Sequence, residues 1–189
     1  MINVNEAAEM RASFDAQTPF SPEMNEDSDE GKQLREKARA AILRTRAKEF
    51  QHDSAGIELG YRYEESPICV SDGTPPPALD HGLYVASTRP GARAPHVWLE
   101  DGRSTLDLFG SGFTLLNLSR DVIDTNPLTA AAKRVGLPLQ TIMLAEPKVR
   151  EACERDFVLV RPDGHVAWRG DALPADPVGI IDRVRGAAR

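Results

Sequence analysis

The stretch VLVRPDGHVAWRG, from Val158 to Gly170, decides how the C-terminal part of this chain folds. Runs of alternating apolar residues flank its Pro162-Asp163-Gly164 centre, and Asp-Gly between two such runs is a strong signal for a β-hairpin. We therefore predict strands over Phe157–Arg161 and His165–Arg169, with Asp163 present for the chemistry of the turn.

Alternation along the second strand places Val166 and Trp168 on one side and His165, Ala167 and Arg169 on the other. A structural role for His165 in this hairpin competes with a role as a catalytic base. Nothing near it in the sequence supplies a nucleophile or an orienting partner, so the structural role is favoured.

The segments around the hairpin alternate between strand and helix patterns. Gly136 is expected to stop one helix, and Asp176 to cap the last one, whose apolar face is Val178, Ile181 and Val184. The order is β-α-β-α-β-β-α over a strand Phe113–Leu118, a helix Pro127–Val135, a buried parallel strand LQTIMLA (139–145), a helix Pro147–Glu154, the hairpin and a final helix.

Residues before Phe113 are less regular. We predict a flexible arm over 1–31, a linker helix over 32–56 capped by Ser28 or Asp29, and a C-terminal domain over 57–189. Within Ile57–Pro77 we expect an extended strand with Tyr61 and Tyr63 on one side. Further short strands are expected at HVWL (96–99) and Leu106–Phe109, with turns at Pro90-Gly91 and Asp101-Gly102. Asp107 is expected to face polar surroundings or a turn amide.

The element order resembles an α/β thioredoxin-like fold with a mixed sheet. The chain has no CxxC, the segment Ser119–Pro127 after the first strand holds no cysteine, and no proline directly precedes Phe157. Cys153 lies beside Glu151 and Glu154, which oppose thiolate formation. Thiol–disulfide chemistry is therefore not expected, and the fold is interpreted as a structural module.

Composition excludes several classes of protein. The 189 residues carry a net charge of −6 with no long basic cluster, which excludes a nucleic-acid partner. No apolar run is long enough to span a membrane, and the N-terminus does not resemble a secretory signal, so a cytoplasmic location is expected. Cys69 and Cys153 are expected to be reduced thiols, and no metal-ligand spacing is present.

Several blocks resemble the C-terminal region of FAD-dependent aromatic hydroxylases, the class A flavoprotein monooxygenases of the phenol and polyketide hydroxylase type. The resemblance rests on LGYRYEESPI (59–68), DGTPPP (72–77), TRPGARAPHVWLEDGRSTLDLFGSGFTLL (88–116) and the hairpin block. It implies FAD and NAD(P)H as cofactors, a phenol-like aromatic substrate, and a thioredoxin-like last domain that takes part in packing and subunit contacts.

The dinucleotide fingerprint of those enzymes is not found. A G-x-G-x-x-G motif must lie between a strand and a helix, so that the pyrophosphate rests on the helix N-terminus. The GxG here is Gly110-Ser111-Gly112, position 115 is leucine, and a strand follows. We therefore expect no FAD or NAD(P)H bound to this chain alone and no catalytic residue within it.

Arg89, Arg93 and His96 are the candidate contacts for a substrate or an anion, because TRPGARAPH gathers two guanidiniums and an imidazole. The alternative, which we favour, is that the arginines tie the loop to carbonyl groups and the histidine pairs with a carboxylate. Trp98 and Trp168 are expected to anchor a core or an interface.

Two functions follow from the resemblance. The first is a non-catalytic domain that forms a homodimer or binds a separate flavin-domain subunit, with an apolar face around residues 32–68. The second is a component that completes an FAD- and NAD(P)H-dependent aromatic hydroxylase in trans.

Overall fold

The computed structural model describes residues 21–46, 55–80 and 82–187, with the backbone only for residues 41–46. Contacts divide the chain into two compact units, Met1–Ser54 and Ala55–Arg189. The predicted division into an arm (1–31), a linker helix (32–56) and a C-terminal domain (57–189) stays a prediction, and most of the arm lies outside the described residues.

The first unit contains a short 3-10 helix η1 (Pro22–Asn25) and the helix α2 (Asp29–Arg46). The helix η1 lies in the stretch predicted to be a flexible arm, and α2 begins at Asp29 rather than Lys32. Ser28 Oγ accepts a hydrogen bond from the Gly31 N–H at 3.1 Å, so Ser28 caps α2 as predicted.

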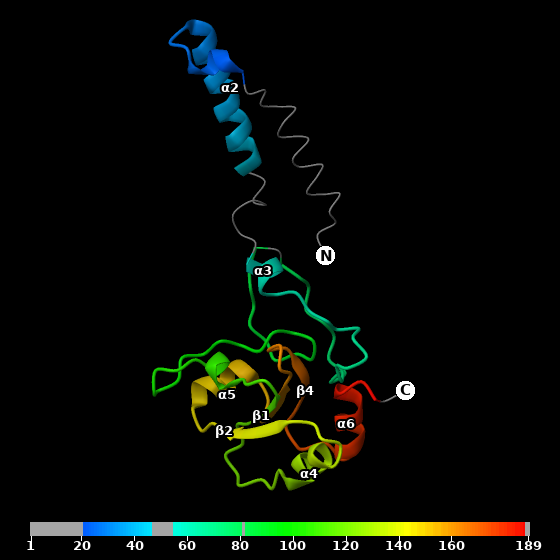
Figure 1. Ribbon diagram of the computed structural model, residues 1–189. Coiled ribbons are helices and arrows are strands. Elements are labelled where there is room, and N and C mark those ends of the chain that lie inside the picture. The colour runs from blue at the N-terminus through cyan, green and yellow to red at the C-terminus, as the bar shows by residue number, and fades with distance from the viewer. Residues whose placement is uncertain (1–20, 47–54, 81, 188–189) are drawn as a thin grey trace. The chain divides into compact units, whose positions relative to one another are not determined.

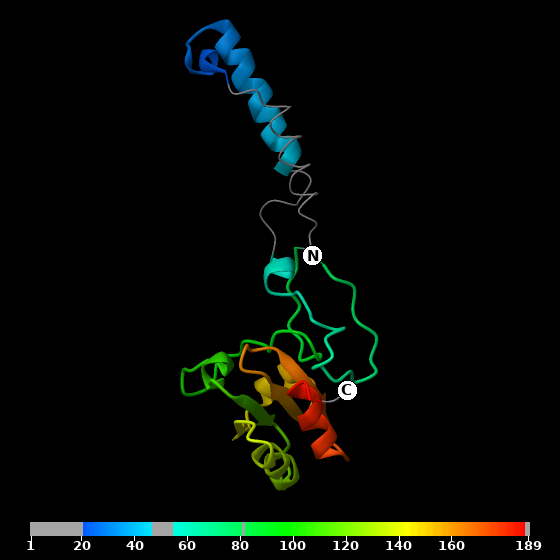
Figure 2. The ribbon, with the colours of Figure 1, turned by 45° about the vertical axis from the view of Figure 1, so that its right-hand side comes forward.

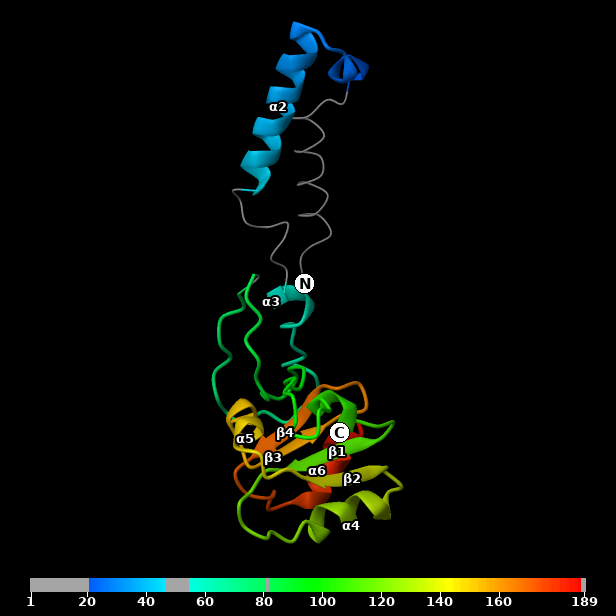
Figure 3. The same ribbon diagram turned by 90° about the vertical axis from the view of Figure 1, so that its left-hand side faces the viewer.

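The second unit is built on a four-stranded mixed sheet with the order β2-β1-β3-β4. Strands β1 and β2 are parallel, whereas β3 is antiparallel to both β1 and β4. Helices α4 and α6 cover one face of the sheet and α5 covers the other (Figures 1 and 3). The predicted order β-α-β-α-β-β-α is confirmed, with strands β1 (Phe113–Asn117), β2 (Leu139–Met143), β3 (Phe157–Val160) and β4 (Val166–Gly170) and helices α4 (Asn126–Arg134), α5 (Pro147–Cys153) and α6 (Pro177–Val184).

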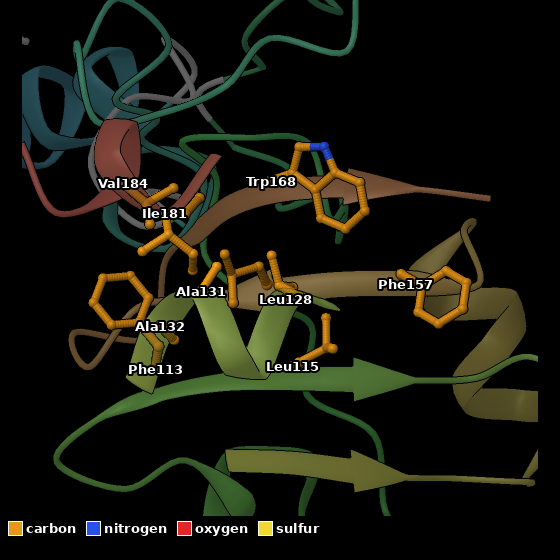
Figure 4. Close-up of a cluster of buried hydrophobic side chains, with 11 residues drawn as sticks. Phe113, Leu115, Leu128, Ala131, Ala132, Phe157, Trp168, Ile181 and Val184 are labelled. Atoms are coloured by element: carbon orange, nitrogen blue, oxygen red, sulfur yellow. The ribbon is translucent and has the colours of Figure 1, made fainter. Parts of the chain in front are cut away.

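Each face of the sheet has its own apolar core. On the α4 and α6 face, Leu128 and Ile181 pack against Leu115, Leu159 and Trp168, and Figure 4 shows this cluster. On the α5 face, Val149 and Cys153 pack with strand residues that include Leu116, Val158 and Val166. Strand β3 is buried on both faces because it lies inside the sheet between two helical layers.

The helix ends follow their sequence signals. Pro127 lies in the first turn of α4, and Gly136, with φ +70°, follows its end. The Asp176 side chain accepts a hydrogen bond from the Gly179 N–H and caps α6. Ile181 and Val184 are buried as predicted, but Val178 is 36% exposed.

The hairpin β3–β4 is present, but the prediction that Val166 and Trp168 lie on the same side of the strand is wrong. Trp168 pairs with Leu159, whereas Val166 pairs with Val160, and the register shifts between these two pairs. The shift places one extra residue, Ala167, in β4. Val166 therefore packs in the α5-side core and Trp168 in the core on the opposite face.

The stretch between α3 (Ala55–Glu58) and β1 corrects three predictions. The expected strands in 57–77 and at 96–99 are wrong, because these residues form no strand (Figure 2). The expected strand at Leu106–Phe109 is the 3-10 helix η2 (Thr105–Leu108). Its capping box pairs the Ser104 N–H with Asp107 Oδ2 at 2.7 Å, which confirms the predicted contact of Asp107. Turns form at Pro90-Gly91 and Asp101-Gly102 as predicted.

The two edges of the sheet differ. Residues 91–94, which we call the edge cover, hydrogen-bond to the outer side of β4, with the Gly91 N–H donating to Val166 O at 2.7 Å. In the irregular stretch before the edge cover, the Val70 N–H donates to Ala167 O at 2.8 Å. Strand β2 is the other edge. Its prediction as a buried strand is wrong, because no strand of the described residues lies beyond it and Met143 is 65% exposed.

Candidate functional site

The Arg89 side chain is buried and binds residues that are distant from it in the sequence. Its Nε donates to Glu64 Oε1 at 3.0 Å and its Nη1 donates to Thr74 Oγ1 at 2.6 Å. The Pro75 carbonyl accepts a further bond from Nη1 at 3.2 Å. Since these partners come from the irregular stretch that precedes the edge cover, Arg89 ties that stretch together.

Arg93 differs from Arg89 in that its guanidinium makes no hydrogen bond or ion pair with any residue that the structure describes. Its backbone forms a bridge with His165, which places it beside the hairpin turn. The side chain lines a surface hollow of about 330 Å³ together with Tyr61, Phe109 and Asp163. It also lines a second hollow of about 100 Å³ that includes Tyr84. Burial raises the pKa of Tyr84, and the Arg93 charge opposes that shift.

His96 is held by its neighbours. Its Nδ1 lies 2.6 Å from Ser104 Oγ, and its ring meets Trp98 edge to face with centroids 4.8 Å apart. Ser104 Oγ also accepts from the Leu106 N–H at 3.0 Å, so His96 is attached to the cap of η2. The predicted carboxylate partner is therefore replaced by a hydroxyl. Trp98 is 62% exposed, whereas Trp168 is in the core.

A buried ion-pair network that sequence reasoning missed centres on Arg169. Its Nε donates to Asp72 Oδ2 at 2.8 Å, and its Nη1 pairs with Glu154, which follows α5. Burial alone would raise the pKa of Asp72, but hydrogen bonds from Thr74 and Arg169 outweigh it and hold the pKa at about 2. The network joins β4, α5 and the stretch before the edge cover. No local motif signals it, because Asp72 and Arg169 lie far apart in the sequence.

Both cysteines are buried and free. Burial, with a smaller contribution from Glu154, raises the pKa of Cys153 to about 12, against the opposing charge of Arg150. The thiolate is the reactive form of cysteine, so Cys153 is a poor nucleophile, as predicted. The Asn117 and Ser119 side chains accept from the Ser119 and Asp121 N–H groups, both at 3.1 Å, in the loop after β1 where redox thioredoxins carry their cysteines.

His165 is buried beneath two tyrosines. The rings of Tyr61 and Tyr63 lie 5.4 Å and 5.0 Å from it, centroid to centroid, and 5.5 Å from one another. Both ring nitrogens of His165 are buried and have no hydrogen-bond partner among the described residues, and Asp163 Oδ1 is 3.6 Å from Nδ1. The two tyrosines share one side of the chain as predicted, although no strand forms there.

Neither a metal cluster nor a membrane helix is found within the described ranges. No three His, Cys, Asp or Glu side chains there are arranged to hold a metal ion. No helix among the same residues is long and apolar enough to cross a bilayer.

Comparison with known proteins identifies the family. Residues 87–188 match the model of the aromatic-ring hydroxylase C-terminal domain. The chain belongs to this family. It is 40% identical over 130 residues to the FAD-dependent monooxygenase apdD of Emericella nidulans, covering 65% of this chain and 21% of that protein. Phenol 2-monooxygenase of a Pseudomonas species is 31% identical over 180 residues, covering 85% and 29%.

Solved structures give the same result. The rebeccamycin biosynthetic enzyme RebC with reduced flavin matches 97% of this chain with a TM-score of 0.74 and 38% identity, over 34% of the RebC chain. The chain therefore spans roughly a fifth to a third of the length of these relatives and corresponds to the C-terminal domain of aromatic-ring hydroxylases.

The Gly110-Ser111-Gly112 motif does not fit the pyrophosphate of the FAD that this family implies. Gly112 lies directly before β1, and a Cβ there would meet the Pro138 carbonyl oxygen at 2.8 Å. Glycine is thus required for packing beside β2, and no helix N-terminus follows to receive a pyrophosphate. The GxG pair is therefore a packing feature beside β2.

Proposed function

We propose that this chain serves an FAD-dependent aromatic-ring monooxygenase as a structural, partner-binding domain that holds no flavin of its own. The observation that carries the proposal is an exposed apolar surface on the stretch after α3. Tyr61 and Leu79 are 41% and 46% exposed, and Leu83 and Val85 are 62% and 68% exposed. Exposed apolar side chains gathered in one stretch are typical of an interaction site.

The partner in this proposal is a flavin-binding subunit or a second copy of this chain. Arg93 is the proposed contact for an anionic or aromatic group, because Arg89 and His96 already have internal partners. The phenol-like substrate and NAD(P)H enter the proposal through the family resemblance, and the cytoplasmic location enters it through the sequence, which shows no secretory signal. Completion of the hydroxylase active site in trans is the alternative. The observation that favours it is the Arg93 guanidinium, which has no hydrogen-bond or ion-pair partner in the described ranges.

Flavin titration tests the first function. The full chain is titrated with FAD while flavin fluorescence and visible absorbance are followed, and no saturable change is expected. Saturable binding would overturn the structural role. A reading frame that encodes G-x-G-x-x-G next to the gene would supply the flavin subunit for the next assay.

The alternative is tested with that flavin subunit. NADPH oxidation and phenol hydroxylation are measured with and without this chain. Stimulation that is lost in Arg93→Ala but kept in Arg103→Ala supports completion in trans, because the one ion pair of Arg103 among the described residues is with the exposed Asp101 nearby. Stimulation unchanged by Arg93→Ala would remove Arg93 from the proposal.

A further inference from the structure

The outer side of β2 presents backbone groups without partners. The Phe113 N–H donates to Pro138 O at 2.8 Å, and the Leu144 N–H donates to Asn117 O at 3.0 Å. In a parallel ladder the bonded residues alternate, so the residues between these two contacts alternately face β1 and face away from it. The residues whose N–H and C=O point away from the sheet are Leu139, Thr141 and Met143.

None of these outward groups bonds to another residue in the described ranges. Strand β2 reads LQTIM, with no lysine, no proline and no charge, and its pairing with β1 has no bulge. Lysine, proline, bulges and covering segments are the usual protection of an edge strand. The other edge has such protection, because β4 carries a register shift and the edge cover.

We propose that β2 pairs antiparallel with β2 of a second copy of this chain, about a two-fold axis at Thr141. Each outward N–H then meets an outward C=O, Thr141 opposite Thr141 and Leu139 opposite Met143. The sheet continues from one copy into the other. A two-fold axis brings the same residues of both subunits together. Each outward N–H of one β2 therefore lies opposite an outward C=O of the other β2, and the reverse holds as well.

Charges beside β2 are complementary under the same two-fold axis. Helix α4 packs against β2, and an open hollow of about 610 Å³ is lined by Asn126, Ala130, Lys133 and Leu139. Asp124 precedes α4 and accepts from the Asn126 N–H at 2.9 Å, whereas Lys133 lies in its last turn. The antiparallel arrangement brings the exposed Lys133 of one copy to the exposed Asp124 end of the other. Lys133 has no ion pair among the described residues.

A second copy fits this edge better than an unrelated strand. The five side chains of β2 are uncharged, so antiparallel pairing with itself creates no like-charge contact. The opposite charges at the two ends of α4 favour the antiparallel direction, which is the direction that a two-fold axis requires. This inference rests on the self-association named under the proposed function and adds its surface. Sedimentation tests it separately from flavin binding.

Met143 offers a matched pair of variants. Its side chain is exposed, and in the proposed register it lies opposite Leu139 and near Lys133 of the second copy. Sedimentation velocity of the full chain over a range of concentrations is expected to show a dimer with a Kd in about the micromolar range. Met143→Lys should weaken it about tenfold, whereas Met143→Glu should leave it within about threefold or tighten it.

Thr141→Pro tests the backbone contact. It removes an outward N–H that β1 does not use, so far-ultraviolet circular dichroism should stay unchanged while the dimer weakens about tenfold or more. A chain that is monomeric up to about 100 μM, a dimer that resists Thr141→Pro, or equal effects of the two Met143 variants would each overturn the proposal.

Discussion

The two edge strands of the sheet differ in their outward backbone groups. Those of β4, the covered edge, are hydrogen-bonded to preceding segments of the chain, whereas those of β2, the bare edge, make no bond within the described residues. At β4, Val70 and Gly91 donate to the strand, and Val166 donates back to Ala92 O at 2.9 Å. At β2, the outward groups have no partner in the described chain. The long stretch before the sheet forms no strand, yet it completes one edge of it. Irregular backbone can therefore protect an edge when its hydrogen bonds are placed one by one.

The covered edge also contains the buried charges. Arg169 and Arg89 have side chains that are 6% and 10% exposed, and both pair with carboxylates of the stretch before the edge cover. Beside the bare edge, Lys133 and Asp124 are exposed. Stability should therefore depend on the ion pairs near β4, and association on the charges near β2.

Arg169→Ala is expected to have the largest effect on stability. It removes the guanidinium that hydrogen-bonds to the buried Asp72 and leaves Asp72, among the described residues, only the Arg89 guanidinium at 3.9 Å as an ion-pair partner. Removing one partner of a buried ion pair lowers the free energy of unfolding by about 3–5 kcal/mol. Urea unfolding followed by tryptophan fluorescence gives the free energy of unfolding. Arg155→Ala is the control, because its ion pair with Asp171 is exposed and worth less than about 1 kcal/mol. Similar losses in the two variants would show that the Arg169 network does not hold the covered edge.

Gly91→Ala and Gly136→Ala compare glycines of similar backbone conformation beside the two edges. Both have positive φ, +91° and +70°. A Cβ at Gly91 would meet the Tyr63 carbonyl carbon at 2.7 Å, whereas a Cβ at Gly136 meets nothing within 4 Å. Gly136→Ala should lower the free energy of unfolding by about 1–2 kcal/mol, because alanine is strained at a positive φ. Gly91→Ala should lower the free energy of unfolding by about 1–3 kcal/mol more, because the added Cβ also clashes with the Tyr63 backbone.

Thermal and urea unfolding of the two glycine variants give this difference. Equal costs would mean that the edge cover shifts away from β4 without loss, and that the contact of Gly91 with Tyr63 does not fix its position.

Acid should loosen the covered edge through Asp72. Its pKa in the folded protein, about 2, is below the ordinary value of 3.8, so its stabilisation is present above about pH 4 and is lost as the pH falls toward 2. The shift corresponds to about 2 kcal/mol. Urea unfolding between about pH 6 and pH 2 should show the wild type and Asp72→Asn converging in acid. A constant difference between them would contradict the assignment.

The sequence predicts the regular half of the domain because its signals are local. Alternation, Asp-Gly at the hairpin turn and Gly136 after α4 act within a few residues, and the strands and helices they predict are present. The capping box of Ser104 and Asp107 is also a local signal. It was overridden by the apolar alternation of Leu106 and Leu108, which suggested a strand.

The candidate site depends on contacts between distant residues, and these have no local signal. Arg89, Arg93 and His96 look equivalent in TRPGARAPH, but only the fold gives Arg89 its carboxylate and His96 its hydroxyl. Likewise, the extra residue in β4 separates Val166 from Trp168, and alternation cannot predict it.

His165→Phe, at the hairpin turn beside the edge cover, is expected to change the free energy of unfolding least. Within the part of the chain that the structure describes, both buried ring nitrogens of His165 make no hydrogen bond. A buried polar group without a partner lowers stability, whereas an apolar ring does not. Phenylalanine keeps the contacts with Tyr61 and Tyr63, so the variant should be as stable as the wild type or up to about 1 kcal/mol more stable.

His96→Phe is the control of opposite sign, because it removes the hydrogen bond to Ser104 and should lower the free energy of unfolding by about 1 kcal/mol. Urea unfolding of both variants gives the comparison. A loss above about 1 kcal/mol in His165→Phe would mean that the contact with Asp163, at 3.6 Å, stabilises the turn, and that the covered edge relies on this imidazole as well as on its arginines.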